Sequence, residues 1–418
     1  MAWGRSAVRL AAQPTRERAR AGAAHDRILC ATAASPVSEL RADAASELGS
    51  TEHDTDGRFV RYANVSKTYD GQKLVVDNLS FDVGRGEFLT MLGPSGSGKT
   101  TCLMMLAGFE TPTSGDILLE GRSINDLPPY RRNIGMVFQN YALFPHLTVA
   151  ENLAFPLTAR RTARAEIKER VRRALEMVQL SGMEDRRPAQ LSGGQQQRVA
   201  VARALIYQPK LVVMDEPLGA LDKQLREQMQ IELKRLHDRL GLTFIYVTHD
   251  QAEALTISDR IAVFDRGRIQ QVATPSQIYE APDSVFVAEF LGETNRLPGT
   301  VQQVAGETCR VELDNGDAVL AYPASRLAPG DRTILCLRPE SVEMDPSDRE
   351  SGNRYSAEIL ERIYLGDHLR IRVRVCGRDD FIIKVQRGSG APSLDIGETC
   401  SVGWRSRDCR ALACPSPA

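Results

Sequence analysis

Hydrophobic and polar positions follow one pattern before about residue 290 and another after it. In the first part, short continuous apolar runs such as 88–92, 211–214 and 243–248 alternate with longer stretches of helical periodicity. Continuous apolar runs are typical of strands buried on both faces of a parallel sheet. Their alternation with helices predicts an α/β core.

Two helical stretches carry clear apolar faces. The first lies in a region of about residues 140–190, which we expect to be a helical insertion, and its apolar face comprises Val171, Ala174, Leu175 and Val178. The second follows the apolar run at 211–214 and comprises Leu225, Met229, Leu233, Leu236 and Leu240. Both series predict helices that pack by one face.

After residue 290, short segments alternate with the period of a strand: 300–304, 309–313, 333–337, 356–360, 368–373 and 380–385. Turn signals at 314–316 and 328–331 separate them, so we expect small all-β barrel material in two related halves. The sequence therefore predicts an extension (1–57), an α/β domain (58–290) and a β domain (291–418).

Composition excludes several classes of protein. The 418-residue chain has a net charge of −1, and its eight cysteines include no Cys-x2-Cys pair. These values argue against non-specific nucleic-acid binding, a zinc site and a disulfide scaffold. No apolar run reaches the ~18–20 residues of a membrane span. Residues 1–57 have few large apolar residues, so we expect a disordered tail, although their Arg-rich start also resembles a transit peptide.

A glycine-rich loop follows the apolar run at 88–92 and precedes a helical stretch. It reads Gly93-Pro94-Ser95-Gly96-Ser97-Gly98-Lys99-Thr100-Thr101, which matches the phosphate-binding pattern Gly-x4-Gly-Lys-Ser/Thr. Glycines let backbone N–H groups surround phosphates, and the helix N-terminus adds positive charge there. We expect Lys99 to reach the β- and γ-phosphates of ATP and Thr100 to bind Mg²⁺.

A second group of motifs resembles the ATP-binding cassette (ABC) family. Residues 191–195 read Leu-Ser-Gly-Gly-Gln, the signature of that family, and an apolar strand at 211–214 ends in Asp215-Glu216 like its Walker B motif. Further matches occur in the order of the family: Tyr69 for the A-loop, Gln139 for the Q-loop, residues 218–222 for the D-loop and His249 for the switch histidine. The resemblance covers roughly residues 59–290.

The resemblance implies specific roles. Tyr69 would stack on adenine, residues 93–101 would hold the phosphates, and Asp215 would bind Mg²⁺ together with Thr100 and Gln139. Glu216 would be the general base, with His249 and Gln139 completing the catalytic group. Two chains would pack head to tail as a homodimer, so that the signature of one closes over ATP bound to the other. That signature surface comprises Ser192, Gly193, Gly194 and Gln195.

The β domain indicates which class of ABC ATPase the chain resembles. Residues 337–340 and 364–367 resemble recurring sequence motifs of the transport-associated OB-type domain in one importer subgroup. This resemblance implies an ATP-hydrolysing importer subunit on the cytoplasmic face of the inner membrane. Its partners would be separate transmembrane permeases and an extracytoplasmic solute-binding protein, with no nucleic acid. Residues 127–146 most resemble spermidine/putrescine importers. Sugar, iron(III), sulfate and phosphonate importers remain alternatives; a non-transport ABC ATPase is disfavoured.

Overall fold

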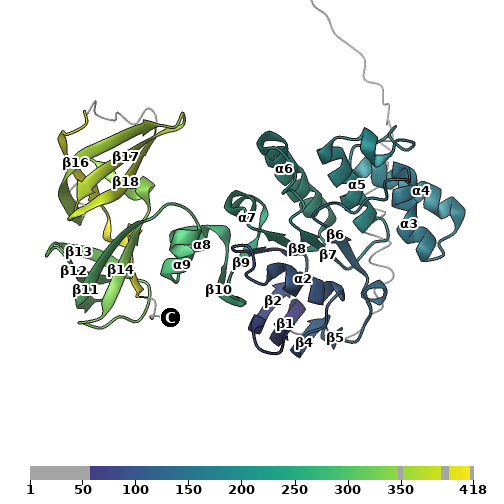
Figure 1. The fold of residues 1–418 in the computed structure, drawn as a ribbon, viewed down its shortest axis with the longest axis horizontal. Helices are drawn as coiled ribbons and strands as arrows, with labels where there is room; N and C mark the ends of the chain where they lie inside the picture. Colours follow the sequence, from purple (N-terminus) through teal and green to yellow (C-terminus); the bar gives the residue numbers. More distant parts are fainter. Residues whose placement is uncertain (1–56, 347–351, 387–394, 415–418) are drawn as a thin grey trace, which may run out of the picture.

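The computed structural model describes residues 57–346, 352–386 and 395–414, so the predicted extension falls outside it except for Gly57. Figure 1 shows an α/β part, coloured purple to teal, and a β part, coloured green to yellow. They are joined by two short helices, α8 (Pro275–Glu280) and α9 (Val285–Phe290). No helix in the described ranges is long and apolar enough to cross a bilayer.

A six-stranded sheet forms the centre of the α/β part. Its strands, in spatial order, are β10 (Arg268–Ala273), β9 (Arg260–Asp265), β3 (Phe88–Leu92), β8 (Thr243–Thr248), β7 (Leu211–Asp215) and β6 (Ile134–Val137). All neighbours pair in parallel except β10 with β9. In β7, Leu211 and Val213 enter one core and Val212 and Met214 enter another. Burial on both faces explains the continuous apolar runs.

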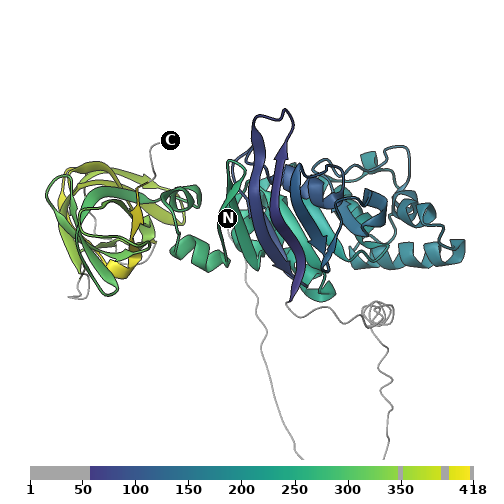
Figure 2. The ribbon, with the colours of Figure 1, turned by 90° about the horizontal axis from the view of Figure 1, so that it is seen from below.

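One face of this sheet is covered by helix α2 (Lys99–Ala107) and by a second, four-stranded antiparallel sheet. Figure 2 shows the two long strands of that second sheet in purple. Its strands are β2 (Leu74–Gly84), β1 (Arg58–Thr68), β4 (Ser114–Leu119) and β5 (Arg122–Ser123). The other face packs against α5 (Gly193–Leu205) and α6 (Lys223–Leu240), which bury Met229, Leu233 and Leu236 as their spacing predicts.

The predicted helical insertion contains α3 (Val149–Ala159) and α4 (Arg164–Met177), which pack with α5 around a small core of their own. Thr148 and Glu151 form a capping box that starts α3. The predicted apolar face of α4 is buried: Val171, Ala174, Leu175 and Val178. Short 3-10 helices flank the insertion at η1 (Pro129–Arg131) and η2 (Pro188–Gln190).

The β part consists of a closed barrel and a five-stranded sheet. The barrel contains β11 (Asn295–Ala305), β12 (Thr308–Leu313), β13 (Ala318–Pro323), β20 (Cys409–Ala413) and β14 (Arg332–Leu337). The sheet contains β15 (Glu343–Met344), β19 (Thr399–Trp404), β16 (Asn353–Tyr364), β17 (His368–Val375) and β18 (Arg378–Gln386), with η3 (Pro339–Ser341) and η4 (Ser406–Asp408) nearby. Both units contribute to one apolar core, which confirms the predicted all-β character.

Arg338 connects the barrel to the linker helices. Its guanidinium donates to the backbone carbonyls of Tyr279, Ala288, Gly292 and Glu293. The same linker packs into the α/β part, because Ile278, Val287 and Leu291 share a buried cluster with Leu92 and Ala254. The barrel is therefore joined to residues beside the phosphate-binding loop through a short, well-packed segment.

Candidate functional site

The carboxyl ends of four parallel strands meet at one edge of the central sheet. Leu92 of β3 pairs with Thr248 of β8, and Asp215 of β7 pairs with Val247. The phosphate-binding loop, Glu216 and His249 directly follow these strand ends, and Gln139 lies two residues beyond the end of β6. Ligands of open α/β sheets bind outside this edge, so the fold places the predicted residues where such a site forms.

The phosphate-binding loop turns sharply from β3 into α2. Gly98 has a φ of 99°, which a side chain rarely adopts, and a Cβ on Gly93 would lie 2.4 Å from the carbonyl oxygen of Phe264. Ser95 and Gly96 are exposed at the tip, whereas Pro94 and Thr101 are half-buried and Ser97 is buried. The backbone geometry thus requires glycine at positions 93 and 98, and the tip of the loop is open to a ligand.

Lys99 is buried within this loop. Its Nζ donates to the carbonyl oxygens of Gly93 at 2.8 Å and Pro94 at 2.9 Å. Burial lowers the pKa of Lys99, while the nearby carboxylates of Glu216 and Asp215 oppose that shift. The ammonium therefore has only neutral hydrogen-bond acceptors in the loop, and an anionic phosphate would be a stronger partner.

Thr100 and Asp215 form an oxygen-rich pair beside Lys99. The Thr100 hydroxyl donates to Asp215 Oδ1 over 3.0 Å. Burial raises the pKa of Asp215, and the hydrogen bond from Thr100 acts against that increase. A hydroxyl and a carboxylate are the hard oxygen ligands that Mg²⁺ prefers, so the donor set fits this ion.

Gln139, Glu216 and His249 come from three different loops and meet at Glu216. Gln139 Nε2 donates to Glu216 Oε2 over 3.4 Å, and His249 Nδ1 lies 3.1 Å from Glu216 Oε1. Glu216 has a φ of 44°, and its backbone N–H donates to the carbonyl of Val247. A non-glycine residue with this backbone is uncommon and is often found at functional sites.

Tyr69 directly follows β1, and the residue is 61% exposed. Lys67 Nζ is positioned over this ring, 4.9 Å from its centroid, and is fixed by an ion pair with Glu110 at 2.9 Å. A large exposed aromatic ring is available for stacking, and the cation on one of its faces leaves the other for a planar ligand.

The signature residues form the N-terminus of α5. Ser192 Oγ accepts from the backbone N–H of Gln195, and Gln195 Oε1 accepts from the N–H of Ser192, so the two form a capping box. A Cβ on Gly193 would lie 3.0 Å from Leu221, and one on Gly194 would lie 3.1 Å from Leu225. The glycines therefore allow the signature helix to pack closely on the D-loop and on the first turn of α6, while Ser192 and Gly193 stay exposed.

Comparison with known proteins places the chain in a family. A model of the ABC transporter family matches residues 76–219, and a model of the TOBE domain matches residues 335–412. The spermidine/putrescine import ATP-binding protein PotA of Rubrobacter xylanophilus is 48% identical over 356 residues, which cover 84% of this chain and 93% of that protein. The protein of the same name from Aliivibrio fischeri is 47% identical over 85% of this chain and 95% of its own length.

This chain belongs to the ABC transporter ATP-binding family. It is accordingly an ATP-binding ABC ATPase that carries a C-terminal TOBE domain. A solved dimer of the ATP-binding cassette MJ0796, bound to ADP and Pi, is 36% identical and covers 52% of this chain and 98% of that chain, with a TM-score of 0.47.

Several side chains at the site of this ABC ATPase were not predicted from sequence. Lys67, Arg226, Asp250 and Glu253 contact predicted site residues or the residues beside them. The capping role of Asp250 could have been predicted, because an Asp before a helical stretch is a common N-cap. Its carboxylate does cap α7 (Gln251–Ile257). The contacts of Lys67, Arg226 and Glu253 join residues close together in the sequence, but no sequence pattern marks these three residues.

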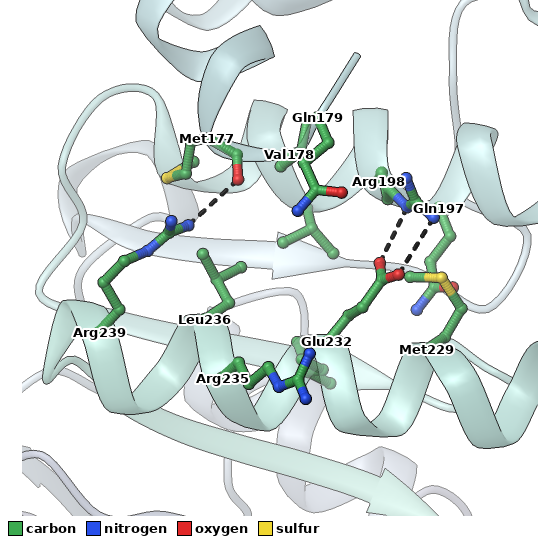
Figure 3. A pocket seen from close by; sticks show the side chains of 12 residues that line it. Met177, Val178, Gln179, Gln197, Arg198, Met229, Glu232, Arg235, Leu236 and Arg239 are labelled. Atoms are coloured by element: carbon green, nitrogen blue, oxygen red, sulfur yellow. Dashed lines mark hydrogen bonds and ion pairs between the residues drawn. The ribbon is translucent and has the colours of Figure 1, made fainter. Parts of the chain in front are cut away.

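A cavity of about 320 Å³ lies between the insertion, the signature helix and α6 of this ATPase. Figure 3 shows two polar contacts at its wall: Arg198 forms an ion pair with Glu232, and Arg239 donates to the backbone carbonyl of Met177. The amide of Gln197 is fully buried and has no hydrogen-bond partner among the described residues. The ion pair of Arg198 with Glu232 thus joins the signature helix to α6 beside this buried amide.

Proposed function

We propose that this chain is the ATP-hydrolysing subunit that powers import of spermidine and putrescine by an ABC transporter. The observation that carries the proposal is the meeting of Gln139 and His249 on Glu216, beside Lys99 and the Thr100–Asp215 pair. The solute follows from relatives named spermidine/putrescine import ATP-binding proteins, which match over most of both chains.

Nucleotide binding depends on Tyr69, the phosphate-binding loop and the Mg²⁺ ligands. Tyr69 stacks on the adenine ring, and the amides of residues 93–101 together with Lys99 bind the phosphates. Thr100, Asp215 and Gln139 would hold Mg²⁺, which neutralises phosphate charge when bound. Asp215 accepts a hydrogen bond from Thr100, and this pairing keeps both oxygen ligands oriented toward the same place.

Hydrolysis depends on Glu216, His249 and Gln139. Glu216 positions and deprotonates the attacking water, because its carboxylate lies at the end of β7 and is only partly buried. His249 and Gln139 contact the two different oxygens of that carboxylate, so they fix its plane from opposite sides. The reaction is mostly positioning and charge stabilisation, as in other phosphoryl transfers.

The signature residues complete the site of a second copy. Ser192 and Gly193 are exposed, and the free N–H groups of a helix N-terminus favour an anion. In a head-to-tail homodimer, residues 192–195 of each copy close over the γ-phosphate bound by the other. This arrangement gives two ATP sites, each built from both chains.

The transporter supplies the remaining partners. Separate permease subunits carry the solute through the membrane, and an extracytoplasmic binding protein delivers it. This chain would therefore lie on the cytoplasmic face of the inner membrane as a peripheral subunit. Residues 291–418 would form its regulatory domain, and residues 58–290 the ATPase domain, with residues of about 140–190 facing the permease.

Uptake by cells tests the proposal. A bacterial strain that lacks its polyamine importer ATPases is given this chain together with its own permeases and binding protein, and uptake of labelled spermidine and putrescine is measured. We expect uptake with the wild-type chain and none with Glu216→Gln, the matched inactive control. Uptake of a sugar, iron(III), sulfate or phosphonate in place of polyamines would overturn the proposed solute.

A further inference from the structure

One guanidinium connects the D-loop to the segment that carries His249. Arg226, in the first turns of α6, donates through Nη2 to the carbonyl of Leu221 at 2.9 Å. Through Nη1 it donates to Asp250 Oδ2 at 3.3 Å. Asp250 directly follows His249 and caps α7 through its other oxygen, which accepts from Ala252 and Glu253. Arg226 thus bridges two loops that are separate in sequence.

The buried carboxyl of Glu253 fixes the other side of His249. Its Oε2 accepts hydrogen bonds from the hydroxyls of Tyr246 and Thr248, each at 2.7 Å. Thr248 immediately precedes His249, and its hydroxyl also accepts from the backbone N–H of Asp250 at 3.0 Å. Arg226 Nε lies 3.8 Å from Glu253 Oε1, so the same guanidinium faces both acids.

His249 depends on these neighbours for its position. Its side chain is 55% exposed, so packing does not fix it, and its ring nitrogen Nδ1 lies 3.1 Å from Glu216 Oε1. The residues on both sides of it, Thr248 and Asp250, are held by Glu253 and Arg226. A change in the Arg226 contacts therefore moves the backbone from which the His249 ring extends, and with it the alignment of Glu216.

We propose that Arg226 is a positioning residue for ATP hydrolysis, which joins the D-loop to the His249 segment so that His249 and Glu216 are aligned. The inference rests on the proposed function, because it assigns a role within the same hydrolysis site. It also assigns a consequence to the D-loop, since a displacement of Leu221 reaches Asp250 through one side chain. Arg226 acts through Asp250 and Glu253 and does not contact the phosphates.

Kinetics of the full-length protein test this role. Arg226→Met keeps length and apolar bulk but removes the charge and the donors. We expect kcat for ATP hydrolysis to fall about tenfold or more, because small misplacements of catalytic groups have effects of this size, while ATP affinity changes less than about twofold. Arg235→Met, at an exposed arginine of the same helix, is the control and should leave both values unchanged.

A conservative variant and a double variant separate positioning from stability. Arg226→Lys retains one point charge that reaches Asp250 or Leu221 but not both, so it should recover part of kcat. Asp250→Asn keeps the helix cap and removes the ion pair, and combining it with Arg226→Met should cost no more than the larger single loss. If Arg226→Met does not fold, judged by its thermal melt, Asp250→Asn must show the kcat loss alone.

The inference and the proposed function fail in different ways. A wild-type chain that does not hydrolyse ATP contradicts the proposed function. A wild-type chain that hydrolyses ATP, with Arg226→Met or Asp250→Asn at wild-type kcat, overturns the role of Arg226. Losses of ATP affinity and kcat by equal factors in the folded variants overturn it as well, because positioning His249 requires a kcat effect.

Discussion

Glu216 Oε1 lies 3.1 Å from His249 Nδ1, although α6 and β8 both lie between the two residues in the sequence. The contact exists because β7 and β8 are adjacent parallel strands that end at the same edge. Glu216 reaches it through a left-handed backbone, with its N–H bound to Val247 of the neighbouring strand. The strands therefore determine the distance, and the backbone of Glu216 determines the direction of its carboxylate.

Replacing Glu216 tests its role as the general base. Glu216→Gln keeps the shape and the contacts with Gln139 and His249 but removes the basicity. Loss of a positioned base typically lowers a rate by ~10²–10⁴-fold, so phosphate release should fall by this factor while ATP binding persists. Slow hydrolysis should also hold two copies together, so sedimentation with Mg-ATP should show a dimer. Hydrolysis near the wild-type rate would remove Glu216 from catalysis.

Lys99 should matter at the binding step. Its Nζ contacts only loop acceptors here, and the charge that it offers to a phosphate is lost in Lys99→Ala. Charge-assisted hydrogen bonds contribute about 1.5–3 kcal/mol, so ATP affinity should fall by about 10–100-fold. Titration with a fluorescent ATP analogue measures this change, and Lys168→Ala, at an exposed lysine of α4, is the control. Unchanged affinity in Lys99→Ala would contradict the assignment.

Glu253 gives a pH-dependent prediction for stability. Burial raises its pKa above 4.5, and the hydrogen bonds from Thr248 and Tyr246 only partly oppose this. A charged Glu253 therefore costs stability at neutral pH, and the folded wild type gains stability as pH falls through the raised pKa toward 4.5, where the unfolded chain also takes up a proton. Glu253→Gln retains an acceptor oxygen and lacks this gain.

We therefore expect Glu253→Gln to melt at or above the wild-type temperature at pH 7.5, with a difference that shrinks as the pH is lowered. Thermal unfolding at a series of pH values measures this difference. Glu227→Gln, at an exposed glutamate of α6, should show no such trend. A difference that grows on acidification would mean that the Glu253 environment favours the charged form.

The loop after Gln139 should couple hydrolysis to transport. Tyr141 is buried, and Arg203 donates to the carbonyls of Tyr141 and Ala142, so this loop is fixed to α5. His146 is exposed at its far end. His146→Glu should reduce polyamine uptake several-fold and leave ATP affinity unchanged, whereas Arg235→Glu, at an exposed arginine of α6 outside the insertion, should affect neither. Equal losses of uptake and ATP affinity in His146→Glu would place this loop at the nucleotide.

Sequence alone could predict those parts of the site in which chemistry requires local spacing. Lys99 and Thr100 follow from one loop, and the apolar run before Asp215 identifies the strand that carries it. The buried faces of α4 and α6 were readable for the same reason, because helical spacing is a local property. The pairing of Thr100 with Asp215 requires knowing which strands are neighbours, and no local pattern gives that order.

Contacts between distant segments that no family motif covers could not be predicted from the sequence. Arg226 meets Asp250 only after α6 and β8 have packed, and an Arg on a helix is usually exposed. The left-handed backbone of Glu216 has no sequence signal, since Glu is not a residue that favours it. The barrel closes through a parallel pairing of β13 with β20, which joins Tyr322 to Arg410 across the whole β domain. Such closure depends on the complete chain and not on any segment.

The hydrogen bonds of Arg338 to the linker helices have a thermodynamic consequence. Linker residues that receive its hydrogen bonds adjoin Val287 and Leu291, which pack with Leu92 before the phosphate-binding loop and with Ala254 after His249. If ATP alters this packing, the barrel changes its orientation, and any molecule that prefers one orientation must in return change the affinity for ATP by the same factor. In that case the barrel would both report the nucleotide state and bias it, with no direct contact between the two ligands.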